Sequence, residues 1–93
     1  LGVICPLPAQ VEMTRAKWGD LTADLHVAAG SPYGDLSDLR EAARRMREAN
    51  VEYVVLDCMG YTIAMKELVR AEVGVPVLLA RSIVARLAAE VLA

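Results

Sequence analysis

Hydrophobic and polar positions divide the chain into four apolar segments separated by longer amphipathic ones. The apolar segments are predicted to be strands, and they are Leu1–Cys5, Asp24–Ala29, Val51–Leu56 and Val75–Ala80. The first of them is continuously apolar rather than alternating, which is typical of a strand that is covered on both faces of a sheet.

The segments between these strands have the signals of helices. Pro8 suits the first position of a helix that ends near Gly19, a plausible residue for the position after its last turn. A second helix begins at Asp35, buries one apolar face and ends near Asn50. Its apolar positions are Leu36, Leu39, Ala43 and Met46. Arginine and glutamate alternate over the remaining surface, which predicts a solvated face.

Two more helices are predicted in the second half of the chain. Thr62 or a near neighbour caps a helix that runs to about Val73 and stops at Gly74. Ser82 is expected to cap the last helix, whose apolar positions are predicted to face the core: Val84, Leu87, Ala88 and Val91.

The predicted order is β-α-β-α-β-α-β-α. Strands that alternate with single helices favour right-handed crossovers and a parallel sheet with helices on both faces. We therefore expect an α/β fold with three αβα layers and a four-stranded parallel sheet in the flavodoxin-like order 2-1-3-4.

Composition fits one small domain over residues 1–93. The 93 residues are 56% hydrophobic and 24% charged, and the net charge is −2. Nucleic acids and anionic membranes attract a basic excess, so neither is expected as a partner. The apolar runs are too short to span a bilayer, and the start has no signal-peptide pattern. Two cysteines form no disulfide framework, and a cytoplasmic location is expected.

The two cysteines are the candidate chemistry. Cys5 ends the first predicted strand, and Cys58 ends the third in "VVLDCMGYT". In the order 2-1-3-4 these strands are neighbours, and ligands bind at the carboxyl edge where the chain order reverses. Cys58 is therefore a candidate catalytic thiol and Cys5 a candidate binding residue. Both could instead pack as small hydrophobic residues, and Asp57 could oppose formation of the Cys58 thiolate.

Other residues are expected at the same edge and are candidates for binding a small carboxylated metabolite. These are Ser31 and Tyr33 after the second strand, Gly60 and Thr62 after the third, and Arg81 after the fourth. Backbone N–H groups at a helix N-terminus suit an anion, and a guanidinium suits a carboxylate. We expect no metal, because no Cys/His cluster is present, and no cofactor, because "GSPYG" lacks a phosphate-loop spacing.

Three blocks carry a resemblance to a known family. "LGVICPLPAQVEMTRAKW", "VVLDCMGYT" with "KELV", and "VPVLLARSIVARLAAEVL" together resemble the carboxy-terminal half of the AroM family, over essentially the whole chain. The resemblance implies an amino-terminal half of similar size that would be the partner of this domain in a longer protein. Family members are bacterial proteins of unassigned activity.

AroM proteins in turn resemble the aspartate/glutamate/hydantoin racemase superfamily. Its members place two thiols, one from each α/β half, on opposite faces of a substrate held by its carboxylate. The resemblance implies that Cys58 matches the thiol of the second half. Asp57 and Met59 stand where racemases commonly have glycine and threonine.

Several functions therefore remain open. The first is thiol-based proton transfer α to a carboxylate, and the second is a non-catalytic module that binds a small carboxylate on the same scaffold. The third is a redox pair formed by Cys5 and Cys58. A domain without its partner half is also expected to expose an apolar face and to self-associate.

Overall fold

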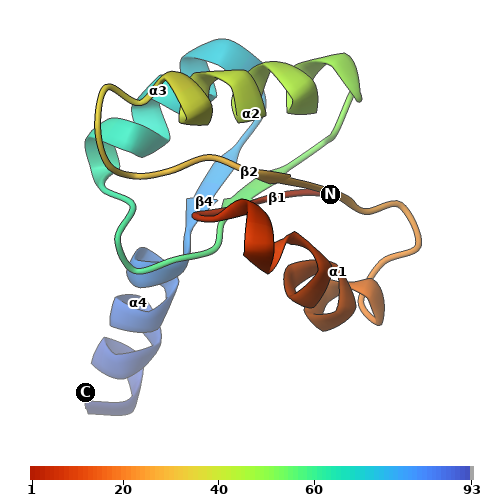
Figure 1. The fold of residues 1–93 in the computed structure, drawn as a ribbon. Helices are drawn as coiled ribbons and strands as arrows, with labels where there is room; N and C mark the ends of the chain where they lie inside the picture. The colour runs from red at the N-terminus through yellow and green to blue at the C-terminus, as the bar shows by residue number, and fades with distance from the viewer. Residues whose placement is uncertain (93) are drawn as a thin grey trace.

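The computed structural model describes residues 1–92 and contains four strands and four α-helices (Figure 1). The strands are β1 (Gly2–Cys5), β2 (His26–Ala29), β3 (Val54–Leu56) and β4 (Val77–Leu79). The helices are the 3-10 helix η1 (Pro8–Gln10), α1 (Val11–Gly19), α2 (Ser37–Glu48), α3 (Ile63–Val73) and α4 (Ala80–Leu92). The strands are shorter than the apolar runs that predicted them. The sheet pairs only Gly2–Cys5 of β1 with β2, residues 2–4 of β1 with β3, and residues 54–56 of β3 with β4.

The sheet is parallel and has the order β2-β1-β3-β4, as predicted. Ile4 of β1 lies beside Ala28 of β2 on one side and Leu56 of β3 on the other, and Leu56 lies beside Leu79 of β4. The chain order reverses between β1 and β3, so the switch point falls at the ends of these two strands.

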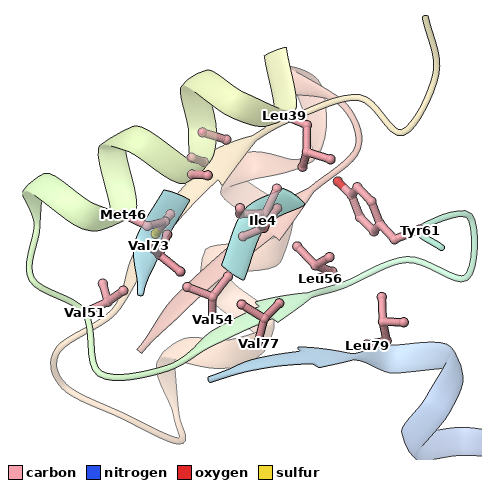
Figure 2. Packing of buried hydrophobic residues seen from close by; sticks show 14 residues of the cluster. Ile4, Leu39, Met46, Val51, Val54, Leu56, Tyr61, Val73, Val77 and Leu79 are labelled. Atoms are coloured by element: carbon pink, nitrogen blue, oxygen red, sulfur yellow. The ribbon is translucent and has the colours of Figure 1, made fainter. Parts of the chain in front are cut away.

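The layers are also as predicted. Helices α2 and α3 cover one face of the sheet, and α1 lies on the other (Figure 1). The main core lies between the sheet and the pair α2/α3, and its side chains include Ile4, Leu39, Met46, Val54, Leu56, Tyr61, Val73, Val77 and Leu79 (Figure 2). β1 is covered from both sides, because Val3 and Ile4 point to opposite faces and both are fully buried.

Helix boundaries follow local chemistry at most of the predicted positions. The Thr62 hydroxyl accepts a hydrogen bond from the Met65 N–H at 3.3 Å and caps α3. Gly74 ends α3 with a φ of 70°, and Asn50 follows α2 with a φ of 56°, both in the left-handed region. Gly19 was wrongly predicted as a residue beyond the helix, because it is the last residue of α1 and Asp20 caps the helix.

Helix α4 differs from its prediction. Ser82 lies within the helix rather than at its cap, because α4 begins at Ala80, directly after the last residue of β4. Ala88 is exposed, as are 62% of Leu87 and 83% of Val91, so the prediction that they face the core is wrong. Because no loop separates β4 from α4, the helix extends away from the sheet instead of folding back over it (Figure 1). The side chain of Val84 lies outside the part of the structure that is described.

None of the helices described over residues 1–92 combines the length and the apolar character that crossing a membrane would require.

Candidate functional site

The loops that follow β1, β2 and β3 meet at the carboxyl edge of the sheet. Backbone hydrogen bonds continue the sheet's pairing past the ends of the strands. The Asp57 N–H donates to the Ile4 carbonyl at 2.9 Å, and the Gly30 N–H donates to the Cys5 carbonyl at 2.8 Å. The ends of β1 and β3 are therefore locked side by side, which brings the two cysteines to one place as the strand order predicted.

A cavity of about 190 Å³ opens at this switch point. Cys5, Asp57 and Cys58 form its wall on the side of the strands. The loop after β1 and one side of η1 and α1 supply the rest of the lining: Pro6, Gln10, Met13, Thr14 and Lys17. The cavity thus combines two thiols, one carboxylate and one ammonium group with apolar and neutral polar side chains.

Cys58 is half-buried and belongs to both the cavity and the core. Its side chain packs against the core under α2 and α3. Its sulfur also accepts a hydrogen bond from the Gly60 N–H at 3.4 Å, within the turn that the Tyr61 N–H closes onto the Cys58 carbonyl. This turn holds the side chain of the half-buried Cys58 at the cavity wall.

Cys5 has a different environment. Only 1% of it is exposed, and its sulfur lies 3.6 Å from the Ala28 carbonyl oxygen and 3.7 Å from the Leu7 carbonyl oxygen, so its single S–H donates to one of the two at a time. A buried thiol with backbone carbonyls as its hydrogen-bond acceptors behaves as a packed wall residue. Its role as a binding residue stays a prediction.

Asp57 makes a compact polar cluster with the last turns of α1. Lys17 Nζ lies 3.1 Å from Oδ1 and 2.9 Å from Oδ2 of Asp57, and Trp18 Nε1 donates to Oδ2 at 3.0 Å. The Asp57 side chain is 15% exposed and that of Lys17 is 61% exposed. The negative charge beside Cys58 is therefore offset by an ammonium group, and Asp57 ties α1 to β3.

Tyr61 is a site residue that the sequence interpretation did not identify. It is fully buried beside the core (Figure 2), and its hydroxyl donates to the Gly30 carbonyl at 2.6 Å. This bond joins the loop after β3 to the loop after β2, beneath the turn that carries Cys58. Burial raises the pKa of Tyr61 well above its ordinary value, and the nearby Cys5, Cys58 and Asp57 add to the rise. The available signal was an aromatic residue between the turn glycine and the helix cap.

Gly30 allows the end of β2 to pack closely against helix α2. A Cβ atom at this position would lie 2.9 Å from the Cα atom of Leu39 and 3.1 Å from the Cβ atom of Ala42. Only glycine lets the end of β2 lie directly against the first turns of α2.

The predicted binding residues divide between two places. Tyr33 and Gly60 lie near Cys58, because a Cβ added at Gly60 would be 3.5 Å from the Tyr33 hydroxyl and 3.7 Å from the Cys58 sulfur. Ser31 lies apart, with its hydroxyl accepting from the Tyr33 N–H at 3.0 Å. It lines a second cavity of about 380 Å³ between the end of β2 and α2.

The remaining two predicted residues lie at helix starts. The Thr62 hydroxyl is engaged in the cap of α3. Arg81 is the second residue of α4, and its side chain lies outside the described part of the structure.

The larger cavity is a weaker candidate than the smaller one. Its charged lining residues are Asp38, Glu41 and Arg45, of which the last two pair with each other at 3.5 Å. It has no thiol, whereas the smaller cavity has two. Among residues 1–92 as described, no three His, Cys, Asp or Glu side chains lie close enough together to hold a metal ion.

Comparison with known proteins identifies a family for this chain. The family model described as AroM protein matches residues 1–92. No curated protein and no solved structure matches the sequence.

Proposed function

The chain belongs to the AroM family, and on that premise we propose that Cys58 transfers a proton at the carbon α to the carboxylate of a small metabolite. The observation that carries the proposal is the half-buried Cys58 sulfur on the wall of the 190 Å³ cavity at the switch point. Drug-sized ligands occupy cavities of roughly 300–1,000 Å³, so this volume suits a smaller acid.

The proposed step is a proton abstraction. The Cys58 thiolate takes the α-proton, the C–H bond breaks, an S–H bond forms, and the electron pair moves onto the adjacent carboxylate as an enolate. Return of a proton completes the exchange. The thiolate is the reactive form, and its proton affinity must suit the working pH. The offset of the Asp57 charge by Lys17 supports this role, because it reduces repulsion beside the sulfur.

Return of the proton from the opposite face, as in the racemases that this family resembles, needs a second acid. We propose that the amino-terminal half of the protein supplies it and covers this edge. Exposed apolar side chains in the segments that follow β1, β2 and β3 support such a cover: Leu7 (54% exposed), Met13 (67%), Tyr33 (76%), Met59 (59%) and Ile63 (66%). Apolar patches of this kind mark surfaces that contact another protein.

A second candidate function is binding without catalysis. The Lys17 ammonium group, which lines the same cavity as Cys58, favours it, since a cation beside a small cavity suits a carboxylate whether or not a reaction follows. In that case the ligand would be sensed rather than converted.

Deuterium exchange separates these two functions. The full-length protein is incubated in D₂O with a panel of small carboxylic acids, and loss of each α-proton signal is followed by ¹H NMR. Proton transfer predicts exchange into at least one acid and its loss in Cys58→Ser. Tyr53→Phe serves as the control and should keep the wild-type rate, because Tyr53 is exposed and directly precedes β3, at the end of the strand opposite to the cavity.

Binding without catalysis predicts no exchange and a thermal stabilisation by one of the acids that persists in Cys58→Ala. Exchange that is unchanged in Cys58→Ser would refute the proposed role of the thiol. Sedimentation of the domain alone and with the amino-terminal half distinguishes a covering half from a second copy of this chain.

A further inference from the structure

Lys17 reaches the candidate site from α1, whereas Cys5 belongs to β1 and Cys58 follows β3. It lies in the last turn of α1, and its ammonium group reaches both carboxylate oxygens of Asp57 at the end of β3. It also lines the cavity that holds Cys5 and Cys58. The position of its ammonium group is therefore set by Asp57, which is 40 residues away in the sequence, and not by α1 alone.

The geometry leaves part of the ammonium group available. An ammonium group has three N–H donors, and the two contacts with Asp57 account for two of them. The Lys17 side chain is 61% exposed, whereas Asp57 is largely buried and is also held by Trp18. A ligand in the cavity can therefore reach Lys17 from the solvent side while Asp57 keeps the ammonium group in place.

We propose that Lys17 binds the carboxylate of the ligand beside Cys58 and that Asp57 limits how much negative charge the site accepts. This inference rests on the proposed function and assigns the group that determines its specificity. Lys17 and Asp57 together carry no net charge. The exposed N–H donor of Lys17 attracts one carboxylate by charge and by a short-range hydrogen bond. The negative charge of Asp57 repels a second carboxylate, so the site favours a ligand with one.

Two alkylating reagents that differ in charge test this inference on the protein itself. In both, the Cys58 thiolate attacks the CH₂ carbon, an S–C bond forms, and iodide leaves with its electron pair. Iodoacetate carries a carboxylate and iodoacetamide does not. The ratio of their rate constants at Cys58 therefore reports attraction of the carboxylate, because the thiolate fraction is common to both reactions.

The full-length chain is treated with each reagent separately, and modification of Cys58 is followed by mass spectrometry of its peptide. Removal of the cation in Lys17→Gln should lower the iodoacetate/iodoacetamide ratio on the order of fourfold, the effect of a unit charge about 5 Å away in a water-like dielectric. Lys17→Arg should keep most of the wild-type ratio. Asp57→Asn keeps an acceptor for Trp18 and should raise the ratio by a similar factor.

Arg15→Gln is the matched control, because it removes one positive charge from an exposed position of the same helix. It should leave the ratio within error of wild type. An unchanged ratio in Lys17→Gln, or an equal fall in Arg15→Gln, would overturn the inference. Failure of the deuterium-exchange experiment with these ratios intact would instead remove catalysis and leave Lys17 as the binding group.

Discussion

Substitution of Tyr61 by phenylalanine tests the link between the two loops beneath the candidate site. The hydroxyl is fully buried and donates to the Gly30 carbonyl at 2.6 Å. Its removal deletes one buried hydrogen bond and leaves a carbonyl without that donor, which costs about 1–2 kcal/mol at neutral pH. For a domain of this size, each 1 kcal/mol corresponds to a fall in Tm of roughly 4–8 °C.

The pH dependence of the same variant gives a sharper test. The folded pKa of Tyr61 is raised, chiefly by burial, above the unfolded value of about 10. The stabilisation by the neutral phenol is therefore complete below about pH 10 and is lost as the pH rises toward the folded pKa. The loss approaches about 1.4 kcal/mol per pH unit, because the unfolded state releases a proton that the folded state keeps.

The assay is urea unfolding followed by far-UV circular dichroism at several pH values from 7 to 11.5, with a thiol reductant present. The wild type should be more stable than Tyr61→Phe at pH 7, and the difference should shrink by about 1 kcal/mol per pH unit above pH 10.5. Tyr53→Phe is the control, because Tyr53 is 51% exposed and should give a parallel curve. A constant difference between wild type and Tyr61→Phe from pH 7 to 11.5 would refute the reasoning.

Three further substitutions test the fold around the site by their free energies of unfolding. Gly30→Ala should destabilise by about 1–3 kcal/mol, because the new Cβ would lie 2.9 Å from the backbone of α2, while Gly19→Ala, which meets no atom within 4 Å, should be neutral or stabilising. Met46→Ala should cost about 2–5 kcal/mol at a 2% exposed position, and the 67% exposed Met13→Ala less than about 0.5 kcal/mol. Thr62→Ala should cost about 1 kcal/mol through the cap of α3, and Thr62→Ser should restore most of it. Equal effects within any of these pairs would contradict the corresponding contact.

The sequence was sufficient to predict the sheet and the meeting of the two thiols. Strand order in an α/β fold follows from the alternation of elements, and the carboxyl edge follows from strand order. Cys5 and Cys58 could be placed side by side for that reason, although 52 residues separate them in the chain. No property of either cysteine alone carried this information.

The same reasoning could not place α4. The spacing of Leu87, Ala88 and Val91 indicates that one side of the helix is apolar, but it does not say what covers that side. The decisive fact is that β4 and α4 are contiguous at Leu79 and Ala80, which a pattern of apolar residues does not reveal. The exposed Leu78 of β4 lies on the face that the helix leaves open.

The polar cluster at the cavity was also beyond the sequence. Lys17 and Trp18 suit the end of a helix, and Asp57 suits a strand end, so each has an adequate local explanation. Their pairing depends on the exact rotation of α1 against β1 and β3. A single amino-acid sequence contains no signal for a contact of this kind.

The burial of Cys5 has a consequence for how folding can be followed. β1 lies between β2 and β3 in the sheet, so Cys5 at its end is enclosed only when both neighbouring strands are in place. The pairing with β3 is non-local and is expected to be among the slower steps of a parallel sheet. The Cys5 thiol is 1% exposed in the complete sheet. Its protection from a fast labelling reagent during refolding therefore reports when β1 has paired with its second neighbouring strand.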